Sequence, residues 1–213
     1  MEKWYSSVDR RPGFTSEAFR VLNMLKAHTA AAASNGKVIA CSLLMDEIAI
    51  RQKVEWDGTR YHGYIDMGTE LDDDSMSVAK EALTFLVFQI NDNFKLPVGY
   101  FLIDGLDATA RSNVVSQCWA KLYNVNINVV SLTFDGVASN IAMVKILECN
   151  LDCSAQNFTT SFPHPITQAP VVVFLDPCHM LKLVQNTLVD KKSMFDEHNE
   201  FIKFEFIVKL HKL

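Results

Sequence analysis

Residues 38–46 read VIACSLLMD, an apolar run that ends in a carboxylate. A short run of this kind is typical of a strand buried on both faces, so we predict a central strand over residues 37–50. Asp46 then lies within this strand or just after its apolar part. A carboxylate inside a buried strand is costly unless it is paired or binds a metal ion, whereas one beyond the strand simply faces water. Taken alone, Asp46 fits the second interpretation better.

The flanking sequence predicts the rest of the fold. The expected elements, in chain order, are a helix over 14–34, the central strand, a hairpin around the Asp57-Gly58 turn with a strand over 61–68, strands over 82–90 and 97–103, a helix over 106–123, a strand over 125–134, a helix over 137–147, a loop over 150–170, a strand over 171–175 and a helix over 178–188. Residues 82–90 fit a helix or a strand, and their aromatic and β-branched content favours a strand. Antiparallel strands followed by alternating helices and strands predict an α/β fold with a mixed sheet, not an all-parallel one.

The composition is that of a folded protein without a membrane span. The chain has 213 residues, of which 49% are hydrophobic and 21% charged, and it contains no run of about 18 apolar residues. Residues 1–4 do not begin an apolar signal segment, so we expect an intracellular protein whose five cysteines are reduced. The formal net charge of −5 argues against a stand-alone DNA-binding module, because such modules neutralise phosphates. It does not argue against a catalytic core whose carboxylates hold metal.

A second carboxylate follows another expected strand. Asp135 comes directly after the run VVSLTF and begins the string DGVASN. Aspartate commonly caps helices, and Asp-Gly is a common turn, so this residue taken alone fits a structural role better than a catalytic one. The pair is more informative, because two acids at the ends of two core strands suit two-metal phosphoryl transfer. Hard divalent cations prefer oxygen ligands held on rigid elements.

A third distinctive string, DPCHMLKL, occupies residues 176–183. In the helix that it begins, His179, Lys182 and Asn186 form a polar stripe. The stripe is either a solvated face or a face toward the active site, where Lys182 meets a phosphate and His179 orients an aspartate. We therefore name His179, Lys182, Asp176 and the neighbour of Asp46, Glu47, as candidates for supporting roles.

Other candidate sites are weaker. Asp72-Asp73-Asp74 lies in an expected polar loop without supporting spacing and is interpreted as solvated. Cys149 and Cys153 lack a second Cys or His pair at the spacing of a zinc site. A Gly-rich phosphate loop, which an unrelated nucleotide-binding α/β domain would carry, is missing from the sequence.

Five strings resemble the P-element transposases and the THAP-domain proteins derived from them. They are LLMDEIAI at 43–50, GYIDMG at 63–68, FKLPVGYF at 94–101, TFDGVASN at 133–140 and DPCHMLKL at 176–183, and the entry PGFT at 12–15 is similar as well. The resemblance spans nearly the whole chain.

The resemblance implies an RNase H-like fold and a cut-and-paste DNA transposase that uses Mg²⁺ or Mn²⁺. Asp46 and Asp135 would be its first and second catalytic, metal-binding aspartates. Residues 1–36 would be a helical lead-in, 37–188 the first part of the RNase H-like core, and 189–213 the start of an inserted domain that binds GTP in this family, with the nucleotide site largely beyond this chain. The resemblance implies DNA at transposon ends as the partner and the nucleus as the location, and it implies no membrane. Whether the chain forms a homo-oligomer is left undecided.

Two departures from the family pattern shape the functional expectation. The family's third acid, a glutamate on a helix after the insertion, has no counterpart before Leu213, and no Cys/His array of a THAP domain precedes Pro12. We therefore expect a fold that is incomplete at its C-terminus and a chain that is inactive as it stands. The alternative is a domesticated, non-catalytic module of RNase H-like fold that binds protein or DNA.

Overall fold

The computed structural model describes residues 11–32, 40–68, 77–90, 94–154 and 156–212. It divides into two compact units, Met1–Phe174 and Leu175–Leu213, and each is described by itself. The first three residues of the expected central strand, residues 37–39, and the acidic loop at residues 72–74 lie outside the described residues.

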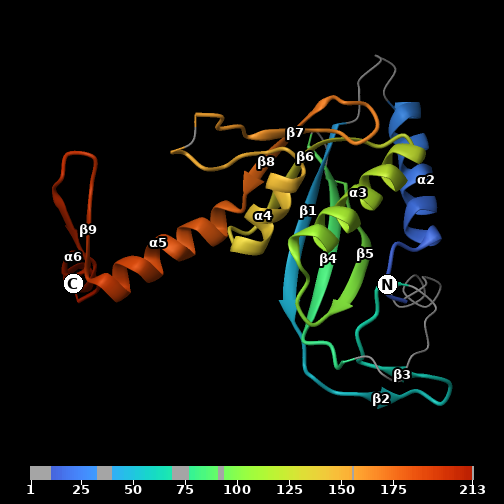
Figure 1. The fold of residues 1–213 in the computed structure, drawn as a ribbon, viewed down its shortest axis with the longest axis horizontal. Helices are drawn as coiled ribbons and strands as arrows, with labels where there is room; N and C mark the ends of the chain where they lie inside the picture. Colours follow the sequence, from blue (N-terminus) through green and yellow to red (C-terminus); the bar gives the residue numbers. More distant parts are fainter. Residues whose placement is uncertain (1–10, 33–39, 69–76, 91–93, 155, 213) are drawn as a thin grey trace. The chain divides into compact units, whose positions relative to one another are not determined.

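The first unit is built on a six-stranded mixed sheet with the strand order β5-β4-β1-β6-β8-β7 (Figure 1). Its strands are β1 (Ala40–Ala49), β4 (Glu81–Gln89), β5 (Lys95–Ile103), β6 (Asn128–Phe134), β7 (Ser161–Pro163) and β8 (Pro170–Leu175). Strand β1 pairs antiparallel with β4 and parallel with β6, while β4 pairs antiparallel with β5. The predicted α/β fold with a mixed sheet is therefore confirmed, and the strand interpretation of residues 82–90 is correct.

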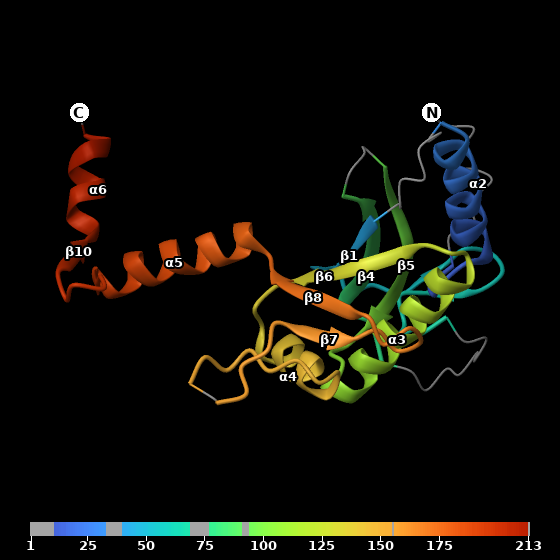
Figure 2. The same ribbon diagram turned by 90° about the horizontal axis from the view of Figure 1, so that it is seen from above.

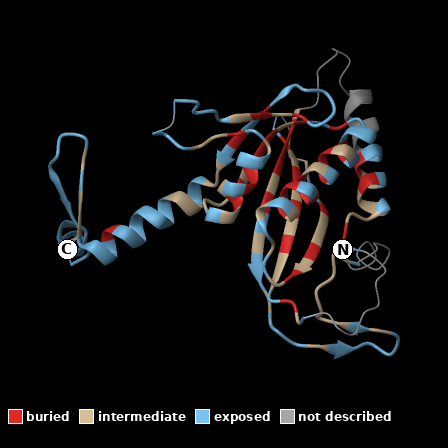
Figure 3. Cartoon of the chain, in the orientation of Figure 1, coloured by how far each residue is buried: buried red, intermediate tan, exposed pale blue. Residues whose placement is uncertain are grey.

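Within the described residues of this unit, the sheet is accompanied by α2 (Ser16–Ala32), α3 (Ala108–Asn124) and α4 (Ala138–Ile146). Helices α3 and α4 pack against each other on the same side of the sheet (Figure 2). Asp107 caps α3 by accepting a hydrogen bond from the Ala110 amide at 2.7 Å. The buried residues concentrate in the central strands and in the sheet-facing side of α3 (Figure 3).

The strand register decides which side chains the core receives. Met45 lies opposite Phe85, and Leu43 lies opposite Val87, so these four side chains share one face of the sheet. All four are buried, whereas their neighbour Leu44, on the other face, is only half-buried. Apolar packing is therefore densest on one face of the sheet.

Several expected boundaries need correction. The loop predicted over 150–170 contains β7, which exists because it pairs antiparallel with β8. Strand β6 begins at Asn128 rather than 125, because α3 continues to Asn124 and Asn126 reverses the chain with a φ of 56°. The hairpin at Asp57-Gly58 is present as β2 (Glu55–Trp56) and β3 (Tyr61–His62), but its second strand is two residues long and belongs to a separate two-stranded sheet.

The turn between β7 and β8 contains a buried histidine and yields a pH prediction. His164 is 5% exposed, and its Nδ1 accepts hydrogen bonds from the amides of Ile166 (3.1 Å) and Thr167 (3.2 Å). Burial lowers the pKa of His164. Because the unfolded chain then takes up the proton first, this histidine should lower the free energy of unfolding as pH falls below about 6.5, by at most about 1.4 kcal/mol per pH unit.

The His164→Asn variant is the matched control, because its Oδ1 can accept from the same two amides but does not titrate. Urea unfolding at about pH 7.5 and about pH 5.5, on either side of the ordinary histidine pKa, should show a smaller loss of stability in the variant. An equal loss in both proteins would contradict the prediction.

The second unit consists of α5 (Pro177–Lys191), β9 (Ser193–Phe195), β10 (Phe201–Lys203) and α6 (Phe204–His211). Strands β9 and β10 form an antiparallel pair. The domain boundary expected between residues 188 and 189 falls inside α5. Among the described helices, none combines the length and the apolar character needed to cross a membrane.

Candidate functional site

The parallel pairing of β1 with β6 relates the two predicted catalytic aspartates. The register pairs Leu44 with Thr133, and Asp46 and Asp135 each follow two residues later. Neighbouring strands lie about 4.8 Å apart, and parallel strands end at the same edge of their sheet. Continuing the register therefore brings Asp46 and Asp135 to the same level at one edge.

Asp46 lies within β1, and its side chain is exposed. Its Oδ1 accepts a hydrogen bond from the adjacent Glu47 amide at 2.9 Å. The Thr84 hydroxyl of β4 donates to the Asp46 backbone carbonyl at 3.0 Å, which fixes the main chain at this point. The Asp46 carboxylate is thus held on a rigid strand and is exposed in the described structure.

Asp135 follows β6 and is half-buried. Its Oδ1 accepts from the Asn140 side-chain amide at 2.6 Å and more weakly from the Val137 amide at 3.4 Å. The N-cap position of α4 is occupied by Val137 and not by Asp135, so Asp135 is not a conventional helix cap. Among the described residues, no hydrogen bond reaches its Oδ2.

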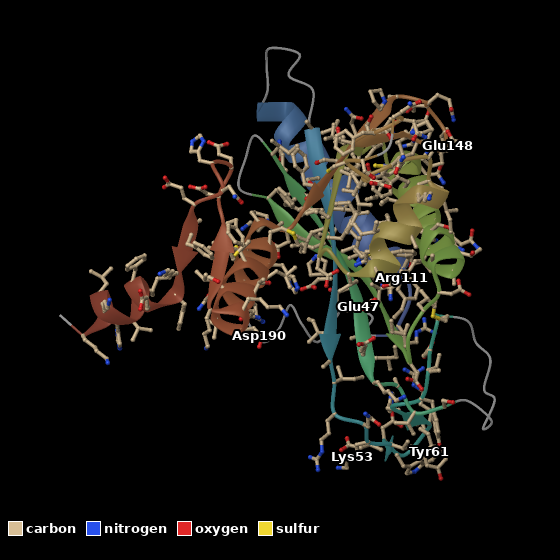
Figure 4. All side chains as sticks on the ribbon, turned by 60° about the vertical axis from the view of Figure 1, so that its left-hand side comes forward. Glu47, Lys53, Tyr61, Arg111, Glu148 and Asp190 are labelled. Carbon is tan, nitrogen blue, oxygen red and sulfur yellow. The ribbon has the colours of Figure 1, made fainter. Side chains whose placement is uncertain are left out.

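Glu47 faces away from Asp46, because successive residues of a strand point to opposite faces. Its carboxylate forms an ion pair with Arg111 of α3, and Figure 4 shows the two side chains meeting between β1 and the helix. Arg111 is 3% exposed and also donates from Nη1 to Asn140 Oδ1 at 3.1 Å. The supporting candidate Glu47 is therefore joined to Asp135 through two residues that the sequence analysis missed.

Both missed residues left a signal in the sequence. Asn140 belongs to the string DGVASN that already singled out Asp135. Arg111 lies on the buried stripe of α3, in line with Val115, Cys118 and Leu122. A cation on the apolar stripe of a helix indicates a buried acidic or amide partner.

The remaining candidates belong to the second unit. Asp176 caps α5, because its side chain accepts a hydrogen bond from the Cys178 amide at 2.9 Å and Pro177 opens the helix. His179 is half-buried, and Lys182 is exposed. Asp176 thus has a structural role as a helix cap, and both interpretations of the polar stripe, as a solvated face and as a face toward the active site, stay predictions. The same unit has a hollow of about 600 Å³ whose lining includes Lys192, Lys203 and Phe204.

The donor set limits the kind of metal site. Within the described ranges, no group of three or more His, Cys, Asp or Glu residues could hold a metal ion. Cys149, the first residue of the weak zinc candidate, is buried and donates to the Thr159 carbonyl at 3.2 Å. The sheet edge instead offers two carboxylates, and Mg²⁺ is commonly held by one or two carboxylates together with water.

Comparison with known proteins agrees with the fold. Residues 10–148 match the family model described as TNP-like, RNase H N-terminal domain, and residues 178–213 match the model described as TNP-like, GTP-binding insertion domain. The chain is 26% identical over 200 residues to human DNA transposase THAP9, covering 91% of this chain and 21% of that protein.

A solved structure shows the same fold. The chain matches the structure titled Drosophila P element transposase strand transfer complex with a TM-score of 0.67 and 19% identity, over 99% of this chain and 41% of that one. The chain thus spans about a fifth of the length of the human protein and about two fifths of the chain in the solved structure. Because the first family model covers more than half of the sequence, the chain belongs to the family of TNP-like, P-element-type transposases, with its RNase H N-terminal domain at residues 10–148.

Proposed function

We propose that this chain contributes two metal ligands to an active site that cleaves and joins DNA strands by phosphoryl transfer. In this proposal, Asp46 and Asp135 each offer a carboxylate oxygen to Mg²⁺ or Mn²⁺. The observation that supports the proposal is the parallel register of β1 and β6, which ends at Leu44 and Thr133 and, continued by two residues, would bring both aspartates to the same edge of the sheet.

The contacts of the two carboxylates fit this role. Among the described residues, the exposed Asp46 carboxylate accepts a hydrogen bond only from the amide of its own neighbour, and both side-chain hydrogen bonds of Asp135 fall on one oxygen. Each carboxylate thus has an oxygen that no described residue occupies. In two-metal phosphoryl transfer, one bound cation would activate the attacking oxygen and the other would stabilise the leaving oxygen. The contribution of the chain is to keep the two carboxylates at fixed positions, Asp46 within β1 and Asp135 directly after β6.

Two carboxylates alone should bind the ion weakly, because hard cations favour several oxygen ligands. We propose that a third acid completes the site in full-length members of the family, as the resemblance to the P-element enzymes implies. DNA as partner, guanine-nucleotide binding by the inserted domain and residence in the nucleus are likewise proposals that the resemblance implies. They rest on the match to the two family models and to human DNA transposase THAP9.

The test is Mn²⁺ and Mg²⁺ binding measured by calorimetry on the whole chain. The wild-type chain should bind Mn²⁺, and the Asp46→Asn, Asp135→Asn double variant should lose that binding, because an amide lacks the charge that attracts the ion. Asp190→Asn is the matched control, since Asp190 is an exposed carboxylate on α5 of the other unit.

The two outcomes have different meanings. Binding that survives in the double variant would show that the ion sits elsewhere and would overturn the site assignment. A folded wild-type chain that binds neither ion would favour a non-catalytic interaction module of the same fold.

A further inference from the structure

We infer that Arg111 is a positioning residue that fixes the orientation of Asp135 through the side-chain amide of Asn140. The inference rests on the proposed function, because it assigns a role toward a proposed metal ligand. Its evidence is a continuous chain of polar contacts that runs from β1 through α3 and α4 to the end of β6.

Arg111 itself is held firmly in place. Its side chain is 3% exposed, and its Nε donates to the Leu106 carbonyl at 3.1 Å. Its Nη1 contacts both the Glu47 carboxylate and Asn140 Oδ1. A buried guanidinium needs partners for its charge and its donors, and Glu47 supplies the opposite charge from the neighbouring strand.

The chemistry of the guanidinium determines which way the Asn140 amide points. An arginine side chain has only hydrogen-bond donors, so it can hydrogen-bond only to the oxygen of the amide. The nitrogen end must then point the other way, where Nδ2 donates to Asp135 Oδ1 at 2.6 Å. Because Asn140 is buried, at 3% exposed, bulk water does not compete for the hydrogen bonds of this amide.

The consequence for Asp135 is a defined carboxylate orientation. Asn140 holds Oδ1, and Oδ2 stays available for an ion at the edge where Asp46 lies. Without Arg111, the Asn140 oxygen would lose this partner, and the amide could rotate away from the Asp135 carboxylate. Partners behind a metal ligand typically change metal affinity by about 10- to 100-fold when they are removed.

The decisive variants separate positioning from stability. Arg111→Met removes the guanidinium but leaves Glu47 as a partly buried, unpaired charge, which destabilises a protein. The double variant Arg111→Met, Glu47→Leu replaces the whole ion pair by apolar side chains and should recover most of that stability. Calorimetry with Mn²⁺ and urea unfolding without metal are measured for both variants and for the wild-type chain.

We expect Mn²⁺ to bind about 10- to 100-fold more weakly to both variants, although the double variant unfolds near the wild-type urea concentration. If the double variant regains wild-type affinity together with its stability, Arg111 has only a structural role and the inference is wrong. Equal affinity of Arg111→Met and the wild-type chain would overturn it as well.

A second measurement works without metal and keeps the inference separate from the proposed function. The side-chain amide signals of Asn140 in a ¹⁵N NMR spectrum, assigned by their loss in Asn140→Ala, report its hydrogen bond to Asp135. They should move toward the position of an exposed asparagine in the double variant. If the wild-type chain binds no Mn²⁺, the proposed function fails, and this spectrum alone decides the inference: unchanged Asn140 signals would reject it.

Discussion

Replacing Trp119 by alanine should lower the free energy of unfolding of the first unit, Met1–Phe174, by about 3–5 kcal/mol. This is the usual cost of truncating a large buried aromatic side chain. Trp119 on α3 is fully buried, and its ring meets Phe162 of β7 edge to face, with the ring centroids 5.7 Å apart. The Trp119 side chain thus links α3 to β7, the strand at one edge of the sheet. Urea unfolding followed by far-UV circular dichroism measures the change.

Trp119→Phe is the matched control. Trp119 Nε1 is buried without a hydrogen-bond partner among the described residues, and an unsatisfied buried donor costs about 1–3 kcal/mol. Phenylalanine keeps most of the apolar volume and the edge-to-face contact, and it removes this donor. The phenylalanine variant should therefore lose much less stability than the alanine variant, and equal losses would show that ring packing is not the source of the effect.

The sequence predicted the central elements well because their patterns are local. Residues 38–46 contain enough consecutive apolar side chains to specify a strand, and β1 occupies most of that run. Residues 82–90 fit both a helix and a strand by their apolar pattern, and their aromatic and β-branched content favours the strand. The structure resolves them as a strand in which Leu83, Phe85 and Val87 are buried, an alternation that a helix would not produce.

What the sequence did not reveal depends on contacts between distant segments. Arg111 finds its ionic partner on β1, 64 residues away, and arginine is normally expected at the surface. Strand β7 is three residues long and ends in Pro163, so its local sequence favours a loop, and its pairing with β8 decides the outcome. The candidate site shows the same division: its two aspartates were found from strand ends, and the network behind Asp135 required the fold.

The segment that precedes α2 packs against β5 at Gly99, a position where only a glycine fits. Gly13 donates from its amide to the Tyr100 carbonyl at 2.6 Å, and the Phe14 ring lies 4.8 Å from that of Phe101 and 5.4 Å from that of Phe85, centroid to centroid. A Cβ atom on Gly99 would lie 2.5 Å from Phe14 Cδ1 and 2.8 Å from the Gly13 carbonyl oxygen. The segment before α2 is thus seated directly on the bare backbone of the strand.

Gly99→Ala should therefore lower the free energy of unfolding of the first unit by about 1–3 kcal/mol, the typical cost of adding a methyl group to a well-packed site. The Phe14 ring can rotate away, but the Gly13 carbonyl can move only if the hydrogen bond from the Gly13 amide to the Tyr100 carbonyl is disturbed. Urea unfolding of Gly99→Ala, Phe14→Ala and the double variant separates these two contributions. Because much of the clash involves the ring, the alanine at 99 should cost less stability when Phe14 is already absent. Strictly additive losses would mean that the ring yields freely and that the backbone contact alone excludes a side chain at position 99.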